Sequence, residues 1–308
     1  MLRQAALPTL RVGHHNPRGA RTVRILLTND DGIGSTALLE LRDRLRRDGH
    51  EVVVSAPAKP CPGAAASFDF FKPHQVQRDA HDANSWSVDG SPAVATLHGL
   101  DLLGREQPFD LVLAGPNNGW SLGRLTLFSG VVGAAQVALH RGVAAIALSM
   151  AYAETDLNAV AGCVATLVGT LAATAQRHAG DAPASGAAPG RLLPRGLGLN
   201  VNLPRCERLL GVAITRVGDW SPWHLGFVES MDRFAHPQQP LPAAPGIALL
   251  DATLQPDAFA DEATEGRMVL RDVMTISPLN VGTLTDAEAM AVLRTRLADL
   301  TLDLGVPA

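Results

Sequence analysis

The sequence predicts an α/β fold with a mostly parallel sheet and helices packed against it, and three observations carry this prediction. Continuous runs of Val, Ile and Leu, typical of strands buried on both faces, recur along the chain. Helical segments stand between them, as Leu38, Leu41 and Leu45 show in the first helix. A strand at 23–28, a helix at about 36–47 and a strand at 51–55 form a unit whose right-handed connection makes both strands parallel.

Composition and charge exclude several classes of protein. The chain has 308 residues, of which 46% are hydrophobic and 18% charged, which is enough for a sizeable core. A net charge of -4 and a pI near 6.2 argue against general nucleic-acid binding. There is no uninterrupted apolar run of about 18 residues, so we expect no membrane span. The three cysteines are widely spaced and odd in number, which implies no disulfide framework or zinc ribbon and favours a cytoplasmic location.

The later elements continue this alternation. Short β-like pieces lie in 68–89, and a helix begins at Pro92 with Ser91 as its N-cap. Further strands are expected at 109–114, 143–150, 197–203, 211–217 and 273–279. Loops are expected at 115–123 and 180–190, and further helices at 129–141, 156–178 and 286–300.

A single domain is predicted for residues 23–308, preceded by an arm. Residues 1–22 carry four arginines and no acid and are expected to be a disordered basic arm, with a nucleotide-attracting or targeting role as the alternative. Residues 219–260 hold several aromatic residues and prolines, which indicates an extended arm or hairpin. Such a segment either packs on a partner subunit, for oligomerisation, or forms a lid.

Two adjacent carboxylates follow the first strand. Its apolar run ends in Asn29-Asp30-Asp31-Gly32, so the acids stand past the carboxyl end of a central strand, the rim where open α/β sheets bind ligands. Neighbouring carboxylates repel each other unless a cation or a proton lies between them, which favours a hard divalent metal site. The alternative is an ordinary turn, because these residue types tolerate tight turns.

A second candidate site follows the strand at 109–114. The loop from Gly115 to Gly123 holds three glycines and two asparagines, a composition that suits a ligand cradle better than a core. The next helix begins at Ser129 and Gly130 and has no acidic residue in its first turn. Its free N–H groups and its dipole can therefore face an anion.

Several motifs occur in a fixed order between about residues 23 and 285. They are LTNDDG at 27–32, SAP at 55–57, GA at 63–64, the spaced Gly115, Asn117, Gly119 and Gly123, FSGVVGAA at 128–135, LNVNLP at 199–204 and TISPL at 275–279. Together they resemble the SurE family, the survival-protein nucleotidases. The resemblance implies a Rossmann-like, three-layer α/β/α fold, a divalent metal, and homodimers or homotetramers built through an extended carboxyl-terminal part.

The resemblance also implies an activity, the hydrolysis of nucleoside monophosphates or other small phosphomonoesters by a metal-activated water. By position, Asp30 and Asp31 resemble the acidic metal ligands and Asn117 the amide ligand. Oxygen ligands of this kind fit Mg²⁺ or Mn²⁺ better than a soft metal.

The same comparison of motifs assigns the phosphate side of the site. Ser129 and Gly130 resemble the phosphate-binding turn at a helix start, and Asn29 resembles a neighbour that shapes the acidic turn. Asp30, Asn117 and Ser129 are the predicted catalytic residues.

The sequence departs from the family pattern at several polar positions. The altered residues are Ala58 for an acid, Pro62 for a serine metal ligand, Ser121 for an asparagine, Arg124 for an acid and Val131 for a threonine. Two hypotheses follow. One is an active phosphomonoesterase, since water can replace a lost ligand on Mg²⁺. The other is a catalytically impaired SurE-like protein that binds a nucleotide or a protein partner.

Two other enzyme classes fit the sequence less well. A dinucleotide oxidoreductase needs a Gly-x-Gly-x-x-Gly turn directly after its first strand, whereas here two acids come first. A serine hydrolase of the α/β class needs Gly-x-Ser-x-Gly at a strand end, and the sequence has none there.

Overall fold

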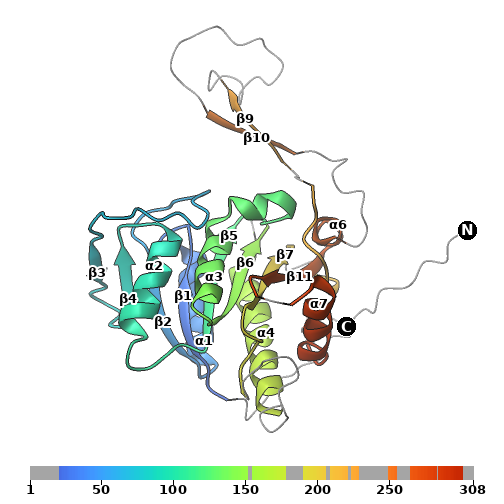
Figure 1. Ribbon diagram of the computed structural model, residues 1–308, viewed down its shortest axis with the longest axis horizontal. Coiled ribbons are helices and arrows are strands. Elements are labelled where there is room, and N and C mark those ends of the chain that lie inside the picture. Colours follow the sequence, from blue (N-terminus) through green and yellow to red (C-terminus); the bar gives the residue numbers. More distant parts are fainter. Residues whose placement is uncertain are drawn as a thin grey trace, which may run out of the picture.

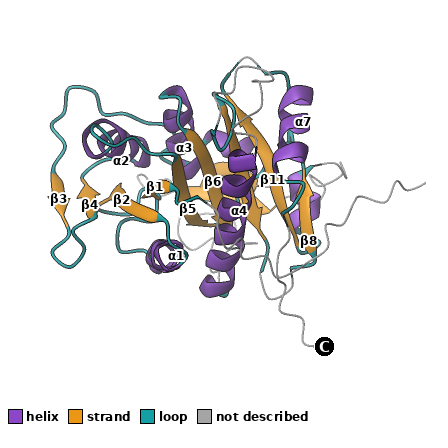
Figure 2. Cartoon of the chain, turned by 90° about the horizontal axis from the view of Figure 1, so that it is seen from below, coloured by secondary structure: helices purple, strands orange, loops and turns teal. Residues whose placement is uncertain are grey.

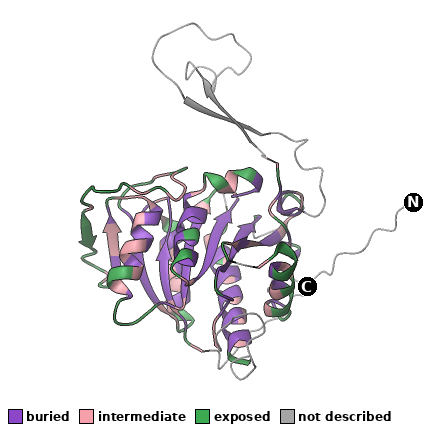
Figure 3. Ribbon diagram, in the orientation of Figure 1, coloured by how far each residue is buried: buried purple, intermediate pink, exposed green. Residues whose placement is uncertain are grey.

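The computed structural model describes residues 21–151, 155–177, 190–205, 209–220, 223–228, 249–254, 264–282 and 284–300, with 223–228 and 249–254 described by their backbone alone. Helices cover both faces of a nine-stranded sheet (Figure 1). The buried residues concentrate in the strands and on the helix faces turned toward them (Figure 3). The predicted three-layer α/β/α fold class is confirmed.

The large sheet has the order β3-β4-β2-β1-β5-β6-β7-β11-β8. Its strands are β1 (Arg24–Thr28), β2 (Glu51–Pro57), β3 (Val76–Arg78), β4 (Ser85–Val88), β5 (Leu111–Asn118), β6 (Ala144–Met150), β7 (Leu197–Leu203), β8 (Gly211–Ile214) and β11 (Val273–Asn280). Within this sheet, the pairs β3–β4 and β7–β11 are antiparallel and the other described pairs are parallel. The strand order reverses between β1 and β5, and ligands bind beyond the carboxyl ends of strands at such a point.

Two helical layers enclose the sheet. The helices are α1 (Thr36–Arg47), α2 (Pro92–His98), α3 (Gly130–His140), α4 (Leu157–Arg177), α6 (Glu265–Val269) and α7 (Asp286–Arg296). Buried side chains of α1, α4 and α7 share one apolar cluster with the sheet, and those of α3 share a second cluster. Figure 2 shows α1 and α4 on one side of the sheet and α2 and α3 on the other.

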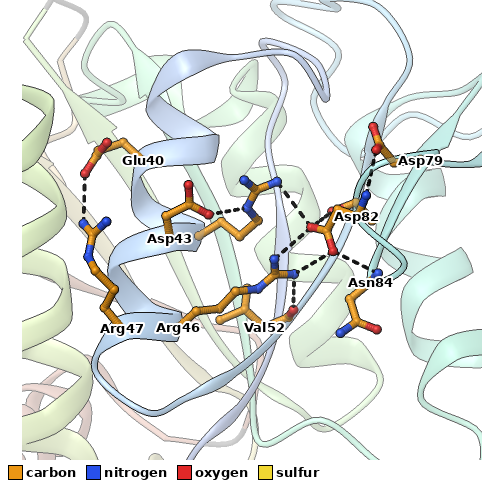
Figure 4. Close-up of polar contacts among 10 residues, drawn as sticks. Glu40, Asp43, Arg46, Arg47, Val52, Asp79, Asp82 and Asn84 are labelled. Carbon is orange, nitrogen blue, oxygen red and sulfur yellow. Dashed lines mark hydrogen bonds and ion pairs between the residues drawn. The ribbon is translucent and has the colours of Figure 1, made fainter.

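The outer face of α1 is joined to the loop before β4 by a polar network (Figure 4). Asp82 accepts hydrogen bonds from Arg46 at 2.9 Å and from Arg42 at 3.3 Å. Its carboxylate also accepts from the hydroxyl of Ser85 at 2.7 Å and from the N–H of Asn84 at 3.0 Å. Two arginines on the outer face of α1 are therefore engaged in holding this loop.

Some boundaries differ from the sequence prediction. β5 extends to Asn118, so the first part of the predicted loop 115–123 is strand, because Asn117 and Asn118 pair with Ser149 and Met150 of β6 after a register shift. A short 3₁₀ helix at Gly123–Leu127 and helix α6 were not predicted. α7 ends at Arg296, earlier than expected.

Helix α4 meets the length and composition of a membrane span, whereas the sequence predicted none because it has no uninterrupted apolar run of that length. It has 21 residues and a mean hydropathy of 1.6 over its most apolar window. That window is 61% buried inside the protein, and its side chains belong to the core cluster shared with α1 and the sheet. Among the described residues it is the single helix of this kind, and its burial matches that of a core helix.

Three predicted segments lie largely or partly outside the described residues. They are the arm at 1–22, apart from its last two residues, the loop at 180–190, apart from Gly190, and most of 219–260. Within the last segment, β9 (Trp223–Val228) and β10 (Leu249–Leu254) pair in antiparallel register as a two-stranded sheet of their own. This pairing agrees with the predicted hairpin.

Candidate metal and phosphate site

The turn after β1 presents the acidic pair. Asn29 is fully buried, and its Nδ2 donates to the carbonyl oxygen of Gly32 at 2.9 Å. Gly32 has a φ of +91°, which glycine adopts without strain. The loop after β2 lies against this turn, because the N–H of Cys61 donates to the carbonyl of Asp30 at 2.8 Å. Asn29 therefore shapes the turn from within.

Asp30 lies in the enclosed part of the turn and is 3% exposed. Its Oδ1 is buried and has no hydrogen-bond partner in the described part of the chain. The N–H of Gly130, at the start of α3, donates to the carboxylate. Burial, followed by the charge of Asp31, raises the pKa of Asp30 to about 7. Such a carboxylate is stabilised by taking up a proton or a cation.

Asp31 joins the acidic turn to the end of β5. It is partly buried, and its Oδ2 accepts from the N–H of Asn118 at 3.2 Å. Burial raises the pKa of Asp31. The neighbouring Asn117 directs its Nδ2 to the carbonyl of Gly119 at 2.6 Å, which leaves Oδ1 as the end of the amide suited to a cation. The carboxyl ends of β1 and β5 thus bring these predicted residues to the point where the strand order reverses.

Ser129 caps helix α3. Its Oγ accepts from the N–H of Val132 at 3.4 Å, and the first turn of the helix holds no acidic residue. The positive end of the helix dipole therefore faces the acidic turn, since Gly130 contacts Asp30 there.

Two further serines and two asparagines stand behind Ser129. The Oγ of Ser121 lies 2.8 Å from the Oγ of Ser129, and Ser149 donates to Ser121 at 2.9 Å. From β7, the Nδ2 of Asn200 donates to the carbonyl of Ser121 at 2.9 Å. The N–H of Ser121 donates to the Oδ1 of Asn202 at 2.8 Å. The sequence motif at 199–204 includes Asn200 and Asn202 but predicted no role for them. Ser149 was not predicted either, because it is a single polar residue in an apolar strand.

The positions that depart from the family pattern fall into two environments. Ala58, Pro62 and Arg124 are exposed. Val131 is fully buried and packs in the apolar cluster on the α3 face of the sheet. Ser121 is 2% exposed and belongs to the group of hydroxyls behind Ser129. Ser121 is therefore the departure that contacts a predicted site residue.

Cys61 follows the same turn but is a poor nucleophile. Burial, and after it the charges of Asp30 and Asp31, raises the pKa of its thiol to about 11. The thiol is then protonated at neutral pH, whereas attack and metal binding require the thiolate. The structure therefore favours an incidental residue at Cys61 over a site thiol.

The oxygen atoms of the turn fit a hard divalent cation. No cluster of three or more His, Cys, Asp or Glu side chains occurs among the residues that the structure describes, so a cation here would rest on two carboxylates and an amide. Thr28, Asn29 and Asp30 each carry a buried side-chain oxygen that has no partner within the described ranges. Free oxygens and two carboxylates with raised pKa values suit Mg²⁺ or Mn²⁺.

The fold and these contacts define an α/β protein with a polar site at the topological switch point of its sheet. The family model described as "Survival protein SurE" matches residues 25–223. The chain belongs to the SurE family.

Named relatives agree with this assignment. The chain is 39% identical over 201 residues to a 5'-nucleotidase SurE of Desulfatibacillum aliphaticivorans, covering 64% of this chain and 72% of the relative. It is 38% identical over 154 residues to a 5'-nucleotidase SurE of Rhodopirellula baltica, covering 48% and 60%. The crystal structure of the SurE protein from Aquifex aeolicus matches with a TM-score of 0.65 and 26% identity, over 88% of this chain and 98% of that one.

Proposed function

We propose that this protein is a metal-dependent phosphomonoesterase that hydrolyses nucleoside monophosphates or other small phosphomonoesters. The observation that carries the proposal is the buried carboxylate of Asp30, which has one oxygen without a partner in the described chain and contacts the first residue of α3. A group suited to a cation and a helix N-terminus suited to a phosphate therefore meet at one point. The relatives named 5'-nucleotidase support nucleotides as the substrate class.

In this proposal, Asp30, Asp31 and Asn117 hold Mg²⁺ or Mn²⁺. When bound, such an ion polarises a phosphate oxygen and lowers the pKa of a bound water. The hydroxyl of Ser129 and the N-terminus of α3 bind the phosphate and stabilise the charge that develops on it. The N–H of Gly130 orients the Asp30 carboxylate, and a phosphate contact by Gly130 remains a prediction.

A second candidate is a SurE-like protein that binds a nucleotide or a protein partner without turnover. It is motivated by Pro62, which has no side-chain oxygen at the position of a family serine ligand. The exposed position of Pro62 leaves room for water, and Mg²⁺ commonly keeps several waters. A water in place of the serine ligand favours the enzyme over the non-catalytic protein.

The assay uses nucleoside monophosphates and p-nitrophenyl phosphate with Mg²⁺ or Mn²⁺. Asp30→Asn is expected to lower kcat/KM about a hundredfold or more, because several kcal/mol of charge stabilisation depends on the ligand. Asp69→Asn, at an exposed aspartate paired with Lys72, is the matched control and keeps full activity. The enzyme proposal fails if wild type is no faster than Asp30→Asn with every metal. Nucleotide binding in calorimetry without turnover supports the second candidate.

Assembly and location complete the proposal. A homodimer or homotetramer is expected, with the segment 219–260 at the subunit contact, and light scattering of the full chain against a chain lacking 229–248 tests this. A cytoplasmic location stays a prediction from the cysteine pattern.

A further inference from the structure

We propose that Ser121 is a positioning residue that fixes the hydroxyl hydrogen of Ser129, so that Ser129 can only donate to a bound phosphate oxygen. The inference rests on the proposed function, because it concerns the phosphate contact of that site. It assigns a task to a residue that departs from the family pattern.

A count of hydrogens decides which of the two hydroxyls donates. A serine hydroxyl has one hydrogen and two lone pairs. Ser149 donates its hydrogen to the Oγ of Ser121 at 2.9 Å. The 2.8 Å contact between Ser121 and Ser129 then needs the hydrogen of one of these two residues. If Ser129 supplied it, the hydrogen of the buried Ser121 would need another acceptor, and the described residues provide none. Ser121 therefore donates to Ser129.

The direction of this chain of hydroxyls fixes the chemistry of Ser129. Its Oγ accepts from Ser121 at 2.8 Å and from the N–H of Val132 at 3.4 Å, so both lone pairs are engaged. The hydrogen of Ser129 remains for a ligand. A hydroxyl in this state donates to an oxyanion and has no lone pair to offer a cation. Ser129 is thereby suited to the phosphate and unsuited to the metal.

The contacts of Ser121 with the sheet keep this series of hydroxyl groups from rearranging. Ser121 is 2% exposed and Ser149 is fully buried. The backbone of Ser121 is held on both sides, because Asn200 donates to its carbonyl at 2.9 Å and Asn202 accepts from its N–H at 2.8 Å. Ser149, Asn200 and Asn202 all lie on central strands of the large sheet. The direction of the hydroxyls is therefore set by the rigid part of the fold.

The test measures binding of inorganic phosphate by calorimetry, with Mn²⁺ present, for wild type, Ser121→Ala, Ser129→Ala and the double variant. Loss of one hydrogen bond is expected to weaken phosphate binding about fivefold in each single variant. The double variant binds no more weakly than Ser129→Ala, because Ser121 acts through Ser129. Ser55→Ala, which removes a fully buried hydroxyl bonded to the carbonyl of Ala95, is the matched control and leaves binding unchanged.

Steady-state kinetics with p-nitrophenyl phosphate separate positioning from a purely structural role. Ser121→Ala is expected to raise KM more than it lowers kcat, since Ser129 keeps its hydroxyl and loses only the orientation in which it binds the phosphate. Misfolding would instead lower kcat through a smaller active fraction. Ser121→Thr retains the hydroxyl and should restore the phosphate affinity. Ser149→Ala, which leaves Ser121 in place but unoriented, should weaken binding less than Ser121→Ala.

The possible outcomes are distinct. Equal phosphate affinity for wild type and Ser121→Ala, or losses that multiply in the double variant, would overturn the positioning role alone. Phosphate binding without hydrolysis of any monoester would remove the proposed function, and the calorimetry would still decide the role of Ser121. A wild-type protein that binds no phosphate would remove both.

Discussion

Gly130 approaches the carboxylate of Asp30 so closely that no side chain fits between them. A Cβ at position 130 would lie 2.8 Å from the Cβ of Asp30 and 2.9 Å from its Oδ2, closer than real Cβ contacts. The N–H of Gly130 donates to the same carboxylate. The start of α3 therefore holds Asp30 in place, and its dipole stabilises the negative charge.

Gly130→Ala is expected to damage both stability and activity. The methyl group must displace the carboxylate or the helix start, and overpacking of this kind costs about 1–3 kcal/mol of unfolding free energy. Denaturant unfolding and kcat/KM are the measurements. Gly34→Ala is the matched control, because a Cβ at Gly34 has nothing within 4 Å. Equal stability and activity of the two variants would show that the close contact between Gly130 and Asp30 does not require glycine at position 130.

Glu265 joins the loop that leads to Ser129 to the segment after β8. It is fully buried, and its carboxylate accepts from the N–H of Gly123 at 2.7 Å and from that of Gly218 at 2.9 Å. Burial raises its pKa, and the two amides oppose the rise. Removal of the carboxylate would leave two buried donors without their acceptor.

Glu265→Ala is therefore expected to lower the unfolding free energy by about 2–4 kcal/mol, the penalty for two unsatisfied amides. Glu265→Gln keeps one acceptor and should lose less. The exposed ion pair of Glu40 with Arg47 provides the control, and Glu40→Ala should change stability by less than about 1 kcal/mol. Urea unfolding of the three variants is the measurement. If Glu265→Ala loses as little unfolding free energy as Glu40→Ala, the Glu265 carboxylate does not hold the two segments together.

The Asp82 network predicts a dependence of stability on pH. Burial alone would raise the pKa of Asp82, but hydrogen bonds from Ser85, Arg46 and Asn84 outweigh it and hold the pKa below 3.8. A carboxyl with a lowered folded pKa stabilises the protein above its unfolded pKa and loses this contribution as the pH falls through the folded value. The contribution is therefore complete above pH 3.8 and declines below it.

Asp82→Asn should reduce the unfolding free energy at neutral pH and should converge on wild type in strong acid. Denaturant midpoints recorded across that range are the measurement. Asp69→Asn, at an exposed acid paired with Lys72, should follow the wild-type curve at all pH values. A constant difference between Asp82→Asn and wild type at every pH would show that the ionised carboxylate is not the source of the stabilisation.

The fold followed from the sequence because the central strands are apolar on both faces. β1, β2 and β6 are continuous apolar runs. Strands of this kind are typical of a parallel sheet that is covered by helices on both faces. The end of β5 was missed for the opposite reason. Asn117 and Asn118 have low strand propensity, and pairing with β6 extends the strand through them.

The candidate site was predictable only where residues follow strands in the sequence. Asp30, Asp31 and Asn117 stand just after or near the ends of two strands that the topology makes neighbours. Ser149 and Asn202 lie within strands and are hydrogen-bonded to Ser121. No spacing in the sequence reveals these contacts. A contribution from the middle of a sheet becomes visible only when register and side-chain direction are known.

The unpartnered oxygen of Asp30 gives the most direct test of the metal. An ion that binds the folded chain alone raises the unfolding free energy by RT ln(1 + [L]/Kd), about 2.7 kcal/mol at a concentration of one hundred times Kd. Mn²⁺ or Mg²⁺ should therefore raise the melting temperature of wild type. Asp30→Asn should abolish most of this gain, because it removes the buried carboxylate from the site.

Asp30→Asn also distinguishes stabilisation by a bound metal ion from the effect of removing a buried negative charge. Without metal, Asp30→Asn should be at least as stable as wild type above pH 7, since burial raises the pKa of Asp30 to about 7 and the ionised form opposes folding there. Asp69→Asn should retain the full response to the ion, because Asp69 lies on the surface beside Lys72. Calorimetric melting with and without Mn²⁺ measures both effects, and an equal metal-induced shift in wild type and Asp30→Asn would place the cation elsewhere.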